Sequence, residues 1–232
     1  MSLYLTVELC ALAIPLAFSF DRKVAYYKMW PFLLPAMLVN ALIFIIIDIY
    51  FTSAGVWGFN PDYHSGIMFA GLPLEELLFF IIIPYCSMFV HYVFIAYLPD
   101  TATGKRTTVT ISSVLLLILL ISILAWSSRD YTSFYSALTA AIILLAWMFN
   151  PSLLSRYYIT FLIIMIPFLT VNGILTGSFI EGEVFWYNSD EISGIRLLSI
   201  PVEDVLFGFS LILLNLITAE WFHQTFKIKF IS

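Results

Sequence analysis

Residues 71–83 read Gly-Leu-Pro-Leu-Glu-Glu-Leu-Leu-Phe-Phe-Ile-Ile-Ile, so a proline and two acids are followed by seven apolar residues. A mostly apolar stretch of about 20 residues is long enough to cross a bilayer as a helix. Proline at the first helical position and acids in the first turn favour a helix start, because the helix dipole attracts negative charge there. The stretch therefore predicts a membrane helix over Pro73–Leu98 that begins with Glu75 and Glu76.

The composition of the whole chain agrees with this prediction. Its 232 residues are 62% hydrophobic and only 11% charged, with a mean hydropathy of +0.99. A soluble domain carries about 25% charged residues, so both a soluble globular domain and a disordered chain are excluded. The balance of 10 basic against 15 acidic residues argues against nucleic acid as a partner. We therefore expect the lipid bilayer to surround the protein.

Seven apolar runs predict about seven transmembrane helices. Their approximate limits are Leu3–Phe20, Trp30–Phe51, Pro73–Leu98, Val109–Ser127, Thr132–Phe149, Tyr157–Ile180 and Pro201–Phe222. The runs are continuous rather than alternating, which predicts an all-α integral membrane protein and not a β-barrel. Cys10 and Cys86 lie inside such runs and are expected to pack there, without a disulfide or a metal.

The basic residues predict the orientation. Eight of the ten fall in segments that share one side of the membrane if the chain crosses it seven times. These are Arg22, Lys23, Lys28, Lys105, Arg106, Arg156, Lys227 and Lys229. The other side has only Arg129 and Arg196. Because Lys and Arg concentrate in cytoplasmic loops, we expect a protein of the cytoplasmic (inner) cell membrane, with the N-terminus outside and the C-terminus in the cytoplasm.

The sequence contains an internal repeat. Segments 60–79 and 188–207 align without gaps, and nine of their paired positions are identical. The most informative matches are Asn60/Asn188, Asp62/Asp190, Pro73/Pro201, Glu75/Glu203 and, with the charge kept, Glu76/Asp204. We expect a first repeat at 1–104, a linking helix at 105–129 and a second repeat at 130–232. Three spans plus one linking span return the chain to the same side, so the two three-helix repeats are expected to be parallel.

Most of the acids within the predicted spans gather in the outer half of the membrane. They are Glu8, Asp48, Glu75, Glu76, Glu203 and Asp204, whereas Glu220 lies toward the other side. An ionisable side chain in hydrocarbon costs about 2.5–3.5 kcal/mol and indicates a functional site. An ordinary helix start is the simpler reading of the two proline–acid motifs. Apolar sequence on both sides of the acids, and the duplication, favour buried carboxyls at the end of a re-entrant or broken segment.

Buried carboxyls of this kind suit proton transfer to an apolar substrate. A carboxylic acid that stays protonated can donate to a poor base such as an alkene. Aromatic faces then stabilise the carbocation. The candidate substrate-binding aromatics are Trp57, Phe79, Phe80, Trp186 and Phe207. For the loop tryptophans, an interfacial aromatic belt is an equally good interpretation.

Phe59-Asn-Pro-Asp62, followed by Gly71-Leu-Pro-Leu-Glu-Glu-Leu-Leu-Phe-Phe80, resembles the signature of the flavin-free, heterodimeric-type lycopene β-cyclases. The resemblance covers nearly the whole chain and implies a fused form of two homologous subunits. It implies an enzyme without a cofactor that converts the acyclic ends of lycopene, or a related acyclic carotenoid, into β-ionone rings without net redox change. The products would be γ-carotene and β-carotene. Other carotenoid-pathway enzymes are possible partners.

The same resemblance implies roles for individual residues. The family's Pro-x-Glu-Glu falls on Pro73, Glu75 and Glu76, and in the second copy on Pro201, Glu203 and Asp204. The Glu75/Glu76 pair would protonate the polyene, and Glu203/Asp204 would remove the ring proton. Supporting roles are expected for Asn40, Asn172, Asp48, Asn60 and Asn188. Amide pairing between helices is an equally good interpretation of Asn40 and Asn172, and no metal site is expected.

Other functions fit the sequence less well. The chain has no Gly-x-Gly-x-x-Gly turn for a flavin, no aspartate-rich pairs with basic partners for a diphosphate, and no lysine in the last span for retinal. A transporter or proton pathway also suits membrane carboxylates and repeats, although its repeats are more often inverted. A related carotenoid-modifying enzyme is the nearer alternative, since capture of the same cation by water makes a hydratase.

Overall fold

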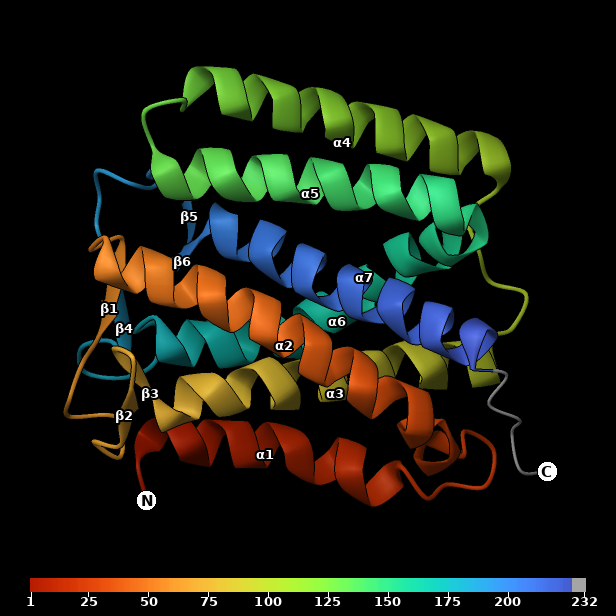
Figure 1. The fold of residues 1–232 in the computed structure, drawn as a ribbon, viewed down its shortest axis with the longest axis horizontal. Helices are drawn as coiled ribbons and strands as arrows, with labels where there is room; N and C mark the ends of the chain where they lie inside the picture. The colour runs from red at the N-terminus through yellow and green to blue at the C-terminus, as the bar shows by residue number, and fades with distance from the viewer. Residues whose placement is uncertain (227–232) are drawn as a thin grey trace.

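The computed structural model describes residues 1–226, and the predicted cytoplasmic Lys227 and Lys229 lie outside these residues. Seven α-helices form a single bundle with nearly aligned axes (Figure 1). They are α1 (Leu3–Phe18), α2 (Trp30–Ser53), α3 (Leu74–Tyr97), α4 (Lys105–Ala125), α5 (Asp130–Phe149), α6 (Pro151–Leu175) and α7 (Val202–Thr225), with a 3₁₀ turn, η1 (Tyr26–Met29), before α2.

Six of the helices are long and apolar enough to cross a membrane. The remaining helix, α1, has 16 residues and is therefore about 24 Å long, somewhat less than the about 30 Å of a hydrocarbon core. It lies alongside the other helices, with the N-terminus at the end of the bundle opposite to the end of α7 (Figure 1). The helical membrane protein expected from the composition is confirmed.

The observed helix bounds differ most from the predicted apolar runs in α4 and α6. Helix α6 begins at Pro151, well before the predicted Tyr157, because the proline starts it and the Asn150 side chain accepts from the Leu153 amide. It stops at Leu175, because Gly177 adopts a φ of +96° and turns the chain away. Helix α4 begins at Lys105 rather than Val109 because its charged first turn precedes the apolar run.

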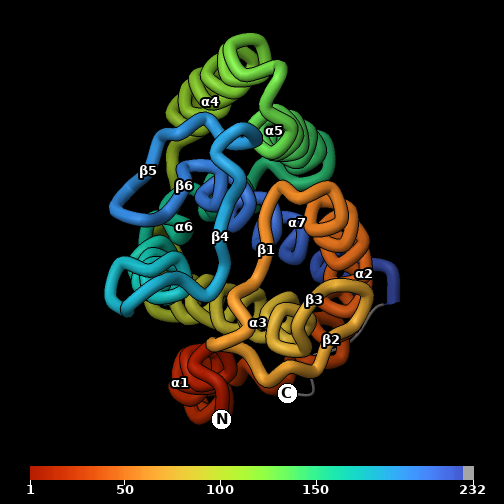
Figure 2. Tube along the Cα trace, turned by 90° about the vertical axis from the view of Figure 1, so that its left-hand side faces the viewer, coloured from red at the N-terminus to blue at the C-terminus, as the bar shows by residue number. Residues whose placement is uncertain are grey.

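Helices α3 and α7 lie in the middle of the bundle (Figure 2). Helix α3 packs against α1, α2, α6 and α7, and α7 packs against α5, α6, α2 and α3. Helix α4 packs against α5 and α6 and covers one side. The two helices that begin with the proline–acid motifs are therefore the most enclosed ones.

Six short strands, which the helical prediction did not include, gather at one end of the bundle (Figures 1 and 2). Strands β1 (Trp57–Phe59) and β4 (Phe185–Tyr187) pair in antiparallel register, with Gly58 opposite Trp186. The amides of Asn60 and Asn188 extend this pair reciprocally, donating to the carbonyls of Val184 and Val56. The two hairpins are β2 (Met68–Phe69) with β3 (Leu72–Pro73), and β5 (Arg196–Leu197) with β6 (Ile200–Pro201).

These hairpins replace the re-entrant segment that the sequence suggested. Pro73 ends β3 and is the N-cap of α3, and Pro201 ends β6 and is the N-cap of α7. Each proline thus lies one position before the helix rather than at its first residue. The expected burial is confirmed, since all four acids that follow the prolines are at most 9% exposed. They lie beneath the strands, where α3 and α7 begin.

The turn that ends α6 provides a test of the fold. A Cβ at Gly177 would overlap the Gly182 carbonyl oxygen, and its positive φ would be strained as well. Gly194 has a φ of +81° with nothing near its Cβ position, so it is a matched control for the backbone strain alone. We expect Gly177→Ala to lower the free energy of unfolding by about 1–3 kcal/mol more than Gly194→Ala. Denaturant unfolding in detergent measures this difference, and equal effects would contradict it.

Candidate active site

Two of the four motif carboxyls, those of Glu75 and Glu203, accept hydrogen bonds from the loops that precede α3 and α7. The Glu75 Oε1 accepts from the Ser2 hydroxyl (2.6 Å) and the Ser65 amide (2.7 Å). The Glu203 Oε1 accepts from the Thr132 hydroxyl (2.5 Å) and the Ser193 amide (2.6 Å). Since Ser65 and Ser193 are paired positions of the aligned segments, both copies of the motif use this acid in the same way. Neither Glu75 nor Glu203 lines the pocket described next.

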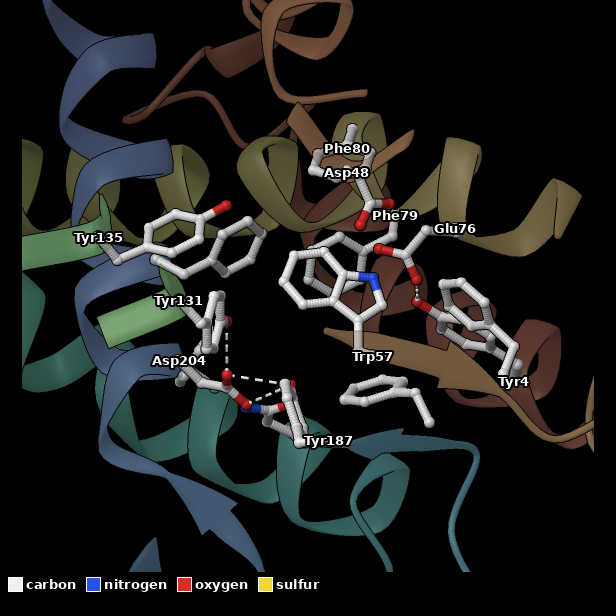
Figure 3. A pocket seen from close by; sticks show the side chains of 15 residues that line it. Tyr4, Asp48, Trp57, Glu76, Phe79, Phe80, Tyr131, Tyr135, Tyr187 and Asp204 are labelled. Atoms are coloured by element: carbon white, nitrogen blue, oxygen red, sulfur yellow. Dashed lines mark hydrogen bonds between the residues drawn. The ribbon is translucent and has the colours of Figure 1, made fainter. Parts of the chain in front are cut away.

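The other two motif carboxyls, Glu76 and Asp204, line a single pocket together with Asp48 of α2 (Figure 3). Consecutive helical residues point about 100° apart, so neighbouring acids on one helix face different surroundings. Glu76 and Asp204 are close enough to interact electrostatically. In the view of Figure 3 the Trp57 indole lies between them. The duplicated motif thus brings one carboxyl from each copy into a shared cavity.

The wall of this pocket is mostly aromatic, and its free volume is only about 50 Å³. Its fifteen lining residues are Tyr4, Asp48, Trp57, Phe59, Glu76, Phe79, Phe80, Tyr131, Tyr135, Phe168, Asn172, Phe185, Tyr187, Asp204 and Phe207. Aromatic faces carry partial negative charge and attract cations. A positive charge formed in this cavity would be stabilised by the rings as well as by the carboxylates.

Asp204 is held by three side-chain donors. The Tyr131 hydroxyl donates to Oδ1 (2.9 Å), the Asn172 amide donates to Oδ2 (2.8 Å), and the Tyr187 hydroxyl lies within 3.0 Å of both oxygens. Burial, together with the nearby Asp204 carboxylate, raises the pKa of Tyr187 well above its usual value. Tyr187 therefore remains a donor, and three donors favour the ionised form of the carboxyl that accepts from them.

Glu76 has a different environment. Its Oε2 accepts from the Tyr4 hydroxyl at 2.6 Å, and it receives no second hydrogen bond from the residues that line the pocket. Two further acids lie close enough to interact with it electrostatically: Asp48, and Glu8 one turn beyond Tyr4 on α1. Both oxygens of Glu8 and the Oδ2 of Asp48 are buried without a hydrogen-bond partner. With one donor and two acidic neighbours, Glu76 is poorly stabilised as an anion and well suited to carry a proton.

The predicted substrate-binding aromatics separate into two groups. Trp57, Phe79, Phe80 and Phe207 line the pocket. Trp186 does not, and 42% of its surface is exposed. Successive side chains of a strand point to opposite faces. Since Phe185 and Tyr187 of β4 face the cavity, Trp186 between them faces away.

The predicted supporting residues also differ in position. Asn172 binds Asp204, as expected, whereas the Asn40 amide donates to the Ala36 carbonyl of its own helix. Asn60 and Asn188 close turns, each accepting from the amide two residues later, and their amides join the strands. Asn40, Asn60 and Asn188 therefore shape the surroundings of the pocket without lining it.

The sequence interpretation singled out Asn172 but not the tyrosines of the pocket. Tyr4, Tyr131 and Tyr135 are absent from the predicted site, although all three line the pocket. The repeat carried a usable signal, because Tyr4 and Tyr131 stand at corresponding places near the start of α1 and of α5. Each donates to the pocket carboxyl of its own copy of the motif. A tyrosine near the end of a membrane helix otherwise resembles an ordinary interfacial residue.

Within residues 1–226, no group of three or more His, Cys, Asp or Glu side chains is arranged to hold a metal ion. What the site offers is a pair of carboxyls with unlike hydrogen-bonding, enclosed by aromatic rings inside an apolar helix bundle. Such an arrangement defines a class of membrane protein able to deliver a proton to a hydrophobic molecule and to take one back.

Comparison with known proteins identifies the family. The family model for lycopene cyclase matches residues 1–94 and 128–222, which is well over half of the chain. The protein therefore belongs to the lycopene cyclase family, which makes it an enzyme with a carotenoid substrate. The matched segments omit residues 95–127, where α4 lies. No curated protein and no solved structure matches the chain.

The two asparagines at corresponding places in α2 and α6 provide a matched test of the site. Asn172→Leu removes a donor to Asp204, whereas Asn40→Leu removes only a bond to the backbone of its own helix. A hydrogen bond to a charged group contributes about 1.5–3 kcal/mol, so we expect Asn172→Leu to lower turnover about 10–100-fold. Asn40→Leu should keep most of the turnover. Carotenoid turnover by both variants in membranes measures this, and an equal loss would contradict the assignment.

Proposed function

We propose that the protein is a lycopene β-cyclase that forms β-ionone rings by proton-initiated, redox-neutral cyclisation, with γ-carotene and then β-carotene as products. The observation that supports this most strongly is the unlike environment of Glu76 and Asp204 in one aromatic pocket. Cyclisation of an acyclic end group needs a proton donor, a proton acceptor and a wall that tolerates positive charge. The pocket provides all three.

In the first step of this scheme, Glu76 is the acid. Its carboxyl proton adds to the terminal double bond of the polyene, and the bond electrons form the new C–H bond. A tertiary carbocation remains at the neighbouring carbon. The electrons of the next suitable double bond attack it and close a six-membered ring, which moves the positive charge onto the ring. Phe79, Phe80 and Phe207 are the aromatic faces placed to stabilise that charge.

In the second step, Asp204 is the base. It removes a proton from the ring carbon next to the cation, and the electrons of that C–H bond form the ring double bond. One proton has entered and one has left, so the product is an isomer of the substrate. A proton shift from Asp204 back to Glu76 restores the starting state, and the scheme consumes no cofactor. Tyr131, Tyr187 and Asn172 hold Asp204 ready to accept.

The second acid pair has a positioning role in this scheme. Glu75 and Glu203 fasten the segments before α3 and α7 and, through Ser2 and Thr132, the starts of α1 and α5. The sequence alone left open which acid of each pair reacts with the substrate. In this scheme the reacting acids are Glu76 and Asp204.

We further propose that the chain is a fused pair of parallel repeats, 1–104 and 130–232, joined by the linking helix. The β1–β4 pair supports this, since Gly58 lies opposite Trp186, its counterpart when the two copies are aligned. The packing also supports it. Helix α3 packs against α1, α2, α6 and α7, and exchanging α1, α2 and α3 with α5, α6 and α7 turns this set into the neighbours of α7. An axis along the membrane normal would then pass close to the shared pocket.

We propose the orientation in the membrane from the distribution of the basic residues. The strand end of the bundle and the pocket then lie on the outer side of the cytoplasmic membrane. Arg129 and Arg196 flank the segments at the strand end, where Arg129 pairs with Asp190 at 3.5 Å. The connections 19–29 and 98–104 lie at the opposite end, as expected for the cytoplasmic side.

Expression in a lycopene-accumulating bacterium tests the proposed function directly. We expect the pigment to shift from lycopene to γ-carotene and β-carotene, as measured by chromatography and mass spectrometry. Hydroxylated products would instead assign a hydratase, in which water captures the cation. Unchanged lycopene in membranes that contain the folded protein would contradict the proposal.

The two kinds of carboxyl predict two kinds of variant. General acid–base catalysis contributes about 10²–10⁴-fold, so we expect Glu76→Gln and Asp204→Asn each to lower turnover by about that factor. Both variants should fold normally. Glu75→Gln and Glu203→Gln should mainly lower thermal stability in detergent and retain more turnover. If Glu75→Gln or Glu203→Gln proved more damaging to turnover than the pocket variants, without loss of stability, the assignment would be wrong.

A further inference from the structure

A second cavity lies between α1, α3 and α6, and we call it the tail groove. Its volume is about 450 Å³, several times that of the carboxyl pocket. Small side chains keep it open, among them Cys10 and Ala11 of α1 and Cys86 and Ser87 of α3. Its wall is overwhelmingly apolar and contains no charged residue. The groove therefore suits a hydrocarbon chain and offers no partner for an ionic ligand.

The tail groove is continuous with the carboxyl pocket. Phe79, Phe168 and Asn172 line both cavities, so these side chains form the boundary between them. Asn172 also holds Asp204 through its amide. A molecule that extends from one cavity into the other passes directly beside the carboxyl that acts as the base.

The tail groove opens sideways, toward the membrane. Ile14 of α1 is 66% exposed, and Cys10 and Pro167 on its rim are exposed as well. These residues lie within the apolar helices α1 and α6 rather than in the loops at the ends of the bundle. A hydrocarbon dissolved in the membrane could enter there without passing through water.

Two of the small residues that keep the tail groove open have larger counterparts in the other half of the chain. When the two halves are aligned, Leu138 of α5 stands in the place of Ala11, and Leu214 of α7 in the place of Cys86. Both leucines pack against the cores of the bundle. The carboxyl pocket thus continues into an open groove beside α1, whereas leucines occupy the corresponding places beside α5 and α7.

We propose that the tail groove holds the unreacted polyene chain of the substrate, which enters from the bilayer, while one end group reaches the carboxyl pocket. This inference rests on the proposed cyclase function and extends it. The carboxyl pocket has far less free volume than the groove, so the groove suits the long unreacted part of the chain better than the pocket does. With one groove, the two ends react one after the other, and the singly cyclised carotenoid must leave and return reversed.

Leucine substitutions test the groove, because the other half of the chain already carries leucine at these places. We expect Ala11→Leu and Cys86→Leu each to lower kcat/KM for lycopene at least about tenfold, since they fill space that the chain needs. Ala13→Leu, on the exposed face of α1 outside the groove, is the matched control and should leave kcat/KM unchanged. Equal thermal stability of the three variants in detergent excludes misfolding as the cause.

A truncated substrate separates this proposal from the proposed function. An acyclic hydrocarbon with the same end group but a short tail needs the pocket and not the groove. We expect the wild-type protein to cyclise both substrates and the groove variants to lose only the long one. Equal effects on both substrates, or undiminished lycopene turnover, would overturn the groove and would mean that a lipid chain or mere packing fills it. Failure of the wild-type protein to cyclise lycopene at all would instead overturn the proposed function.

Discussion

The arrangement of the site depends on one constraint: a carboxyl buried in an apolar bundle is stable as an anion only where the protein supplies hydrogen-bond donors. Glu75, and the Oε1 of Glu203, meet this constraint with backbone amides and hydroxyls of the loops and of the first helical turns. Those bonds fix the start of α3 and of α7. They leave the next residue on each helix, Glu76 or Asp204, facing the cavity between the helices.

The unequal distribution of donors in this cavity accounts for the chemistry that we propose. Three donors around Asp204 favour its anion, and the single tyrosine hydroxyl on Glu76 leaves that group suited to carry the proton. A symmetric pair would have no preferred direction of proton transfer. The aromatic wall and the adjoining tail groove both suit the proposed substrate. The reacting molecule is a hydrocarbon, and its only charge is the transient carbocation that the aromatic rings stabilise.

The sequence predicts the helical membrane protein, the burial of the four acids and four of the eleven aromatic residues of the pocket wall, because these follow from apolar length and from the duplicated motif. It did not predict which acid of each pair faces the cavity, although the step of about 100° between helical neighbours required a choice. Strands of two or three residues leave too short an alternating pattern to be recognised. The sequence therefore favours Trp186 for the pocket wall that Tyr187 in fact lines. Tyr4 and Tyr131 were missed because their role depends on contacts between distant segments.

The central claim is that Glu76 and Asp204 work as one pair, and a double-mutant cycle tests it most directly. The turnover of Glu76→Gln, of Asp204→Asn and of the double variant should be measured with lycopene in membranes of matched protein content. Groups that act as a unit are strongly non-additive. The account predicts that the double variant loses no more turnover than the more damaging single variant. Losses that multiply would show two independent groups and would contradict the account.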